Sequence, residues 1–413
     1  MGFRFADRIE RVRPSAIREL LRLGDDPSIT SFGGGYPDPA LFPVDELHAV
    51  YAELLTADRR GTLQYTASVG LPALRRLVAE RMRREGVDCD LDDVLILQGA
   101  QQGLDLAGKL MINPGDVVVT ENPTFLGALI AFHPYEPRYA PVRTDGSGLD
   151  VDALEEVLAT TPDARFVYVI PDFQNPRGVT LSLPRRHRLI ELANRYDVAV
   201  LEDTPYRELR FEGEQVPTLK SLDTEGRVIH LGSFSKTLAP GLRMGWAVAR
   251  PDLLEKLGLL KLAADTQSST LNMHAVARFL ERFDIDAHVA RVRAAYRAKR
   301  DVMLAAMEEH FPDGVTFTRP EGGLFTWVSF PEGFDSAAFM AERALPEARV
   351  AYVPGGTFFP ATDVPNHARF CYSGVPEQQM VDGIRRLGAL LTHELGGRPL
   401  AAATSARRSE PER

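Results

Sequence analysis

The chain has 413 residues, of which 44% are hydrophobic and 25% charged, as in an ordinary globular protein. These proportions exclude a mainly disordered chain, a collagen and a small disulfide-stabilised scaffold. At about 150 residues per domain, the length predicts two to three domains. The net charge of −9 argues against nucleic acid or an anionic membrane as the main partner.

The two cysteines, Cys89 and Cys371, are too few for a disulfide framework or a cysteine-rich zinc site. We therefore expect no metal site and a reducing, cytoplasmic location. Residues 1–20 are charged and lack the apolar core of a secretory signal. No run approaches the roughly 18 apolar residues of a membrane span, so we expect no membrane segment.

The first 50 residues contain one expected helix, 14–23, and a Gly- and Pro-rich stretch, FGGGYPDPALFP (32–43). Such a segment cannot form a domain alone. We expect residues 1–50 to be an arm that packs on a smaller domain or on a partner chain.

Short apolar runs alternate with helical patterns over residues 51–290. The expected strands are 93–97, 116–120, 165–170, 197–203, 227–233 and 245–249, and the expected helices are 71–86, 100–112 and 184–197. Strands that are apolar throughout and separated by helices predict a mostly parallel sheet covered on both faces. Such open sheets bind ligands at the carboxyl ends of their strands.

The pattern changes towards the C-terminus, where 251–310 is almost wholly helical. Beyond it we expect strands at 315–319, 324–330, 349–353 and 368–373, and helices at 335–344 and 376–395. The fold class is therefore α/β, with a large domain at 51–290 and a smaller α+β domain at 291–396. Residues 397–413 are small, polar and charged, which predicts a disordered tail.

Lysine is rare, because only six of the 48 basic residues are lysine: Lys109, Lys220, Lys236, Lys256, Lys261 and Lys299. Five of them lie in helical stretches or an ordinary loop. Lys236 instead directly follows a strand, within GSFSKTLAPGLRMGWAVA (232–249). Ser233, Ser235 and Arg243 flank it, and two hydroxyls with a guanidinium can hold a phosphate. An amine beside a phosphate site is what a Schiff base to pyridoxal phosphate (PLP) requires.

Three more side chains at strand ends meet the demands of that cofactor. Asp203 ends the DVAVLED strand and could pair with the pyridine nitrogen, so that the ring acts as an electron sink. Tyr206 and Asn175 could bond the cofactor's 3-oxygen. Each residue alone also fits an ordinary cap or turn.

The phosphate and the ring need further partners. Gly99, Ala100 and Gln101 lie at a strand–helix junction, where free N–H groups and the helix dipole attract an anion. Phe125 follows the next strand and could stack on the ring, although it could equally be a core residue. Their common order at strand ends favours a PLP site over separate structural roles.

Seven motifs extend this pattern over most of the chain: SFGGGYPDPALFP, LQYTASVGLPALR, GAQQGLDL, FQNPRG, EDTPYREL, GSFSKTLAPGLRMGWAVA and RPEGGLFTWV. With them the chain resembles the class I/II aminotransferases of PLP fold type I. Within that family it is similar to the α-aminoadipate (LysN-like) and kynurenine/α-aminoadipate branch. The resemblance implies a PLP-dependent transferase fold and a homodimer with shared active sites. It also implies transfer of an amino group from an L-amino acid to a 2-oxo acid, commonly 2-oxoglutarate.

The resemblance further implies how the cofactor is held. Lys236 would form the internal aldimine and move a proton between the substrate Cα and the cofactor's C4′, by way of pyridoxamine phosphate. Asp203 would pair with the pyridine nitrogen. The other implied contacts are Asn175 and Tyr206 at the 3-oxygen, Phe125 on the ring, and Gly99, Ala100, Gln101, Ser233, Ser235, Arg243 and Tyr65 of the partner subunit at the phosphate.

The implied substrate contacts come from the arm and the smaller domain. Arg369, in HARFCYSG, would clamp the α-carboxylate near Asn175 and the backbone of Gly35. Arg18, on the expected helix 14–23, could meet an acidic side chain or be a plain amphipathic-helix arginine. Tyr36 stands where related sequences often carry leucine. This departure, with Arg177 and Thr204-Pro205, favours a donor other than aminoadipate.

Two alternatives remain at this point. The same scaffold could run another PLP reaction, as a racemase, lyase or oxidase, because fold does not fix function. It could also be a non-enzymatic sensor, as in regulators that fuse this fold to a DNA-binding domain. The acidic charge, the complete catalytic set and the lack of a winged-helix segment ahead of the fold argue against a sensor.

Overall fold

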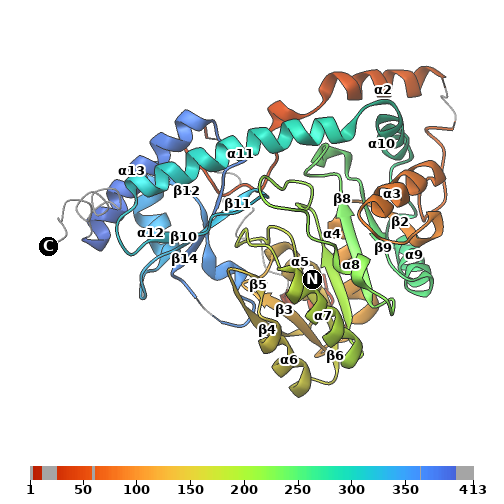
Figure 1. Ribbon diagram of the computed structural model, residues 1–413, viewed down its shortest axis with the longest axis horizontal. Helices are drawn as coiled ribbons and strands as arrows, with labels where there is room; N and C mark the ends of the chain where they lie inside the picture. The colour runs from red at the N-terminus through yellow and green to blue at the C-terminus, as the bar shows by residue number, and fades with distance from the viewer. Residues whose placement is uncertain (1–2, 12–25, 58–60, 363, 397–413) are drawn as a thin grey trace.

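The computed structural model describes residues 3–11, 26–57, 61–362 and 364–396. The expected helix 14–23, with Arg18, and the expected tail 397–413 lie outside the described residues. A large sheet with its helices forms one part of the molecule and a smaller sheet forms another, and the long helix α11 (Ile285–His310) runs along both (Figure 1).

The large sheet has the strand order β2-β9-β8-β7-β6-β3-β4-β5. Its strands are β2 (Val94–Leu97), β3 (Val117–Asn122), β4 (Arg138–Asp145), β5 (Gly148–Leu149), β6 (Ala164–Val169), β7 (Ala199–Asp203), β8 (Val228–Ser233) and β9 (Gly245–Val248). The five strands from β8 to β4 are parallel, whereas β9 runs antiparallel to both of its neighbours. The expected mostly parallel sheet is confirmed.

Helices cover both faces of this sheet, which explains why its central strands are rich in apolar residues. On β6, Phe166 and Tyr168 enter one hydrophobic cluster, while Val167 and Val169 enter another on the opposite face. Alternate side chains of a strand point to opposite faces, so both sets must be apolar. The helices are α3 (Pro72–Arg84), α4 (Ala100–Met111), α5 (Leu126–Phe132), α6 (Val151–Thr160), α7 (Leu183–Arg195), α8 (Leu219–Leu222), α9 (Pro251–Asp265) and α10 (Thr270–Arg282).

The first 50 residues contain the start of a helix that was not expected from the sequence. Helix α2 (Val44–Ala57) begins inside that segment. Its Val50 and Leu54 are buried against α10, at the i, i+4 spacing of an amphipathic helix. The apolar stripe was therefore present in the sequence.

The smaller sheet is antiparallel, in the order β10-β11-β14-β13. The elements of this part are β10 (Thr316–Phe317), β11 (Phe325–Ser329), α12 (Ser336–Phe339), β12 (Val350–Ala351), β13 (Val353–Pro354), β14 (His367–Cys371) and α13 (Glu377–Leu395). The expected helix 335–344 is short, since α12 continues as a π-helix over Met340–Ala348. From the N-terminal arm, β1 (Thr30–Ser31) pairs in parallel with β12.

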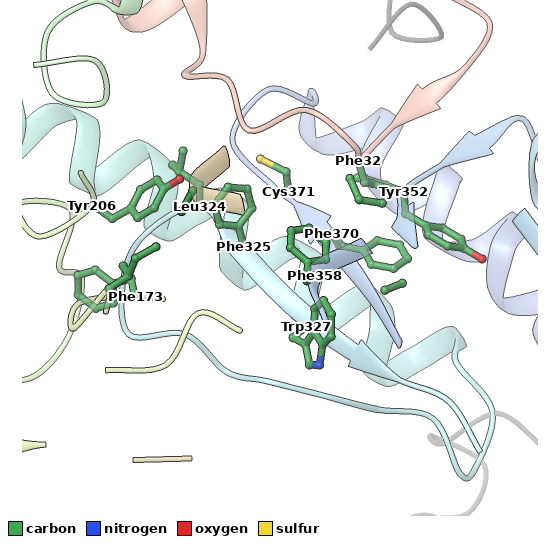
Figure 2. Packing of buried hydrophobic residues seen from close by; sticks show 14 of the residues in the cluster. Phe32, Phe173, Tyr206, Leu324, Phe325, Trp327, Tyr352, Phe358, Phe370 and Cys371 are labelled. Carbon is green, nitrogen blue, oxygen red and sulfur yellow. The ribbon is translucent and has the colours of Figure 1, made fainter. Parts of the chain in front are cut away.

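Aromatic rings join the smaller sheet to the large one. Phe325 of β11 meets Tyr206, which follows β7, edge-on at 5.5 Å, and within the smaller part Phe370 stacks on Tyr352 at a centroid distance of 5.1 Å. Figure 2 shows Phe325 between Tyr206 and the rings around Phe370. Because side chains alternate along β14, Arg369 points away from the face that carries Phe370.

A buried cluster of charges holds the loop that follows β6. Asp172 is 1% exposed and pairs with Arg186 at 2.8 Å, Arg207 at 3.2 Å and Arg210 at 3.7 Å. Burial alone would raise the pKa of this carboxyl, but the three guanidinium groups outweigh it and hold the pKa below its ordinary value. The stabilisation is therefore present at neutral pH and is lost as the pH falls through the lowered pKa.

Replacing Asp172 by Asn should destabilise the protein by about 3 kcal/mol or more, because it leaves the buried Arg186 guanidinium without its counterion. Urea unfolding followed by circular dichroism measures the change. Asp252→Asn removes an exposed ion pair with Arg250 and should cost less than about 1 kcal/mol. Equal small losses in the two variants would contradict the prediction.

Candidate active site

A cavity of about 710 Å³ opens where the carboxyl ends of the large sheet face the arm and the smaller sheet. Its lining residues are Gly35, Tyr36, Ala100, Gln101, Leu104, Phe125, Ile170, Asn175, Asp203, Pro205, Tyr206, Ser233, Ser235, Lys236, Pro240, Arg243, Phe325 and Arg369. Most of the residues expected from the sequence are therefore brought together. The volume suits a ligand of cofactor size.

The amine of Lys236 lies in this cavity, in the loop directly after β8. Its Nζ donates a hydrogen bond to the backbone oxygen of Gly35 in the arm, at 2.8 Å. Loss of water around the amine, together with the positive charges of Arg369 and Arg243, lowers the pKa of Lys236 to about 8. A lysine with such a pKa supplies a free amine near neutral pH.

Asp203 is the last residue of β7 and is 2% exposed. Its Oδ2 accepts a hydrogen bond from the Tyr168 hydroxyl at 2.9 Å, whereas its Oδ1 has no hydrogen-bond partner among the residues that the structure describes. Burial raises the pKa of Asp203 to about 7, against the opposing effect of the Tyr168 hydrogen bond. A buried acceptor without a donor is costly, and the N–H of a pyridinium ring would satisfy it.

A chain of hydrogen bonds crosses the cavity from Tyr206 to Arg369. The Asn175 Nδ2 donates to the Tyr206 oxygen at 3.3 Å, and Arg369 Nη1 donates to Asn175 Oδ1 at 2.9 Å. The Arg369 guanidinium lies 4.3 Å from the centre of the Phe325 ring, and its Nε has no partner. No carboxylate of the described chain pairs with this buried cation, which leaves it available to a ligand carboxylate.

Backbone and side-chain donors converge where α4 begins. Gly99 caps the helix with φ +75°, and a Cβ there would lie 2.8 Å from Arg243 Nη2, so only glycine admits the guanidinium. The same Nη2 donates to the Gln98 oxygen at 2.9 Å. The hydroxyls of Ser233 and Ser235 bond each other at 2.9 Å beside this turn. The donor set fits a phosphate dianion.

Two aromatic residues, Phe125 and Tyr36, also line the cavity. Phe125 precedes α5 and lies against Gly127, whose backbone oxygen accepts a hydrogen bond from the Gln101 side chain. Tyr36 is 58% exposed, and its backbone oxygen accepts a hydrogen bond from the Ser373 hydroxyl at 2.6 Å.

Three expected site residues are not among those lining the cavity. Gly99 lies directly behind it, under the Arg243 guanidinium. Tyr65 is 80% exposed and lines a separate hollow with Gln267 and Thr270. Arg18 lies outside the described residues.

Sequence reasoning missed five lining residues: Leu104, Ile170, Pro205, Pro240 and Phe325. The most informative of them is Phe325, which packs on both Tyr206 and Arg369. The sequence feature that could have indicated Phe325 is the Gly322-Gly323 pair just before its strand. A Cβ atom at either glycine would lie within 3 Å of Phe173. The glycines mark a close approach of the two sheets.

The lowered pKa of Lys236 predicts how its reactivity depends on pH. In protein freed of small molecules, labelling of Lys236 by an amine-directed reagent should be half-maximal near pH 8, because the reactive free amine forms above the pKa. Mass spectrometry of the labelled peptide measures it, with an unstructured lysine peptide, of pKa about 10.4, as the control. A midpoint near that of the peptide would contradict the prediction.

The described residues contain neither a helix that could cross a membrane nor a group of three or more His, Cys, Asp or Glu side chains placed to hold a metal ion.

Comparison with known proteins identifies the family. The family model for aminotransferase class I and II matches residues 34–387. Aromatic-amino-acid aminotransferase 1 of Thermococcus litoralis is 42% identical over 396 residues, which cover 95% of this chain and 94% of the relative. The 2-aminoadipate transaminase of Thermus thermophilus is 41% identical over 384 residues, covering 92% and 94%.

A solved structure agrees with these relatives. The kynurenine aminotransferase of Pyrococcus horikoshii, in complex with PMP, KYN and KYA, matches with a TM-score of 0.91 at 40% identity, over 95% of this chain and 97% of that chain. The relatives confirm the resemblance inferred from the sequence, and they support transamination rather than racemase, lyase or oxidase chemistry. The chain belongs to the class I and II aminotransferases, which are PLP-dependent enzymes of fold type I.

Proposed function

We propose that Lys236 is the catalytic amine of this aminotransferase and that the 710 Å³ cavity binds both the cofactor and the amino acid. The observation that carries the proposal is the buried Asp203 Oδ1, which lacks a donor in the same cavity as an amine with a pKa of about 8. PLP supplies an electron sink for the negative charge that develops on the substrate Cα.

Asp203 binds the pyridine nitrogen through its free Oδ1, while Tyr168 fixes the other oxygen. A carboxylate at that nitrogen keeps it protonated. Asn175 and Tyr206 donate to the 3-oxygen, and Phe125 covers the ring. The serine pair, Arg243 and the N–H groups of the turn formed by Gly99, Ala100 and Gln101 hold the phosphate.

The substrate is an L-amino acid in one half of the reaction and a 2-oxo acid, for which we propose 2-oxoglutarate, in the other. Arg369 binds the α-carboxylate near Asn175 and Gly35, and the Phe325 ring keeps the guanidinium oriented. With the cofactor bound, Lys236 would carry the proton that is removed from the substrate Cα. Tyr36 borders the side-chain pocket. The proposal retains Arg18 as a candidate contact for an acidic side chain.

The proposal includes a homodimer in which Tyr65 reaches the phosphate of the partner subunit. Its support is the exposure of Tyr65, with Leu63, Leu259 and Leu262 also exposed. The proposal also includes two domains. A large domain at 51–290 contains the large sheet, and a smaller domain at 291–396 contains the smaller sheet. A cytoplasmic location is supported by the two cysteines, both free and buried.

Lys236→Ala should lower the rate of transamination by at least about 10³-fold, because it removes the group that moves the proton. The direct measurement is a half-reaction, in which one amino acid converts the cofactor of the wild-type enzyme stoichiometrically to its amine form. Lys256→Ala, at an exposed lysine on α9, is the matched control. Full turnover by Lys236→Ala would rule out the assignment.

Arg243→Gln should weaken binding of PLP by about 10-fold to 100-fold, since a charge-assisted hydrogen bond to the phosphate is lost. Pyridoxal, which has the same ring without the phosphate, should bind with unchanged affinity. Titration of the apoenzyme with each compound measures both constants, and Arg250→Gln, at an exposed arginine, is the control. A parallel loss of affinity for both compounds would place the phosphate elsewhere.

A further inference from the structure

Lys261 is completely buried, unlike its neighbour Lys256, which is 54% exposed on the same helix α9. Its Nζ lies 2.8 Å from both carboxylate oxygens of Asp265, one turn further along the helix, and 3.3 Å from Gln102 Oε1 on α4. Gln102 Nε2 also donates to Asp265 Oδ2 at 2.7 Å. The three side chains therefore form a closed network between two helices.

Stability of α9 does not explain this network. Asp265 is the last residue of the helix, where the dipole disfavours a carboxylate. Burial lowers the pKa of Lys261, against the opposing effect of Asp265. A buried ion pair gains little net stability over an apolar pair of the same size.

The network ends at the turn where α4 begins. Gln102 Oε1 also accepts a hydrogen bond from the Gln98 backbone N–H at 2.8 Å, and the Gln98 oxygen accepts from Arg243 Nη2 at 2.9 Å. The backbone of Gln98 is thus bonded at its N–H by Gln102 and at its carbonyl oxygen by Arg243. Gly99, the next residue, opens the turn that we assign to the phosphate.

We propose that Lys261 is a positioning residue for the cofactor phosphate, acting through Gln102 and the Gln98 peptide. The inference rests on the phosphate site given under the proposed function. Without the lysine, Gln102 loses a donor and the Asp265 carboxylate loses its counterion. Both changes oppose phosphate binding. The turn is less constrained, and the negative charge of Asp265, which is linked to the turn through Gln102, is no longer compensated.

Lys261→Met tests this role in the apoenzyme of the full chain, titrated with PLP and with pyridoxal. We expect the dissociation constant for PLP to rise about tenfold, as when a hydrogen bond to a charged group is lost, with little change for pyridoxal. The ratio of the two constants is the readout, because a merely structural role would move both together. Lys256→Met on the exposed face of α9 should leave the ratio unchanged.

Gln102→Leu supplies a second variant that keeps the Lys261–Asp265 pair and should show the same phosphate-selective loss. It preserves the test if Lys261→Met fails to fold. An unchanged ratio in the folded variants would overturn the inference. If Arg243→Gln changes the ratio and Lys261→Met and Gln102→Leu do not, the phosphate site stands and the positioning role is wrong. If Arg243→Gln does not change it either, the phosphate site itself is wrong.

Discussion

Three cationic side chains share one cavity, and the rest of the site depends on their mutual repulsion. Lys236, Arg243 and Arg369 all border it, and the two guanidinium groups help to lower the pKa of the amine. Asp203 is the carboxylate among the lining residues, and burial raises its pKa to about 7. The cavity is therefore electrostatically incomplete without anions. A phosphate beside Arg243 and a carboxylate beside Arg369 supply them, which links substrate and cofactor binding to the protonation state of Lys236.

The parallel sheet brings these groups together because all of its parallel strands end at one edge. Asp203 ends β7, and Ser233 ends β8, two residues before Ser235 and three before Lys236. Arg369 comes from the smaller sheet, on the face of β14 opposite that of its neighbour Phe370. The arm contributes Gly35, whose oxygen holds the amine. Residues at the ends of successive parallel strands thus lie close together in space, because the crossover helices return the chain so that each of these strands runs in the same direction.

The elements that could be predicted from the sequence are those buried on both faces. β6 and β8 are mainly buried and were expected within a residue or two of their ends, whereas β4 is mostly part-exposed and was not expected. The site residues that follow these strands were found for the same reason. Phe325 was not predicted as a site residue, because its partners Tyr206 and Arg369 are distant from it in the sequence. The Lys261 network could not be predicted, since it depends on how α4 packs against α9.

Lysines in this chain differ in chemistry according to their counterions. Lys220, Lys256, Lys261 and Lys299 each pair with a carboxylate within 3.1 Å. Lys236 has no such partner in the described chain and is bonded instead to the neutral oxygen of Gly35. Burial also lowers the pKa of Lys261, but the hydrogen bond and the charge of Asp265 oppose that shift and stabilise the charged amine. Desolvation together with the absence of a carboxylate sets Lys236 apart, so placing a carboxylate beside it would raise its pKa and suppress the free amine that the reaction needs.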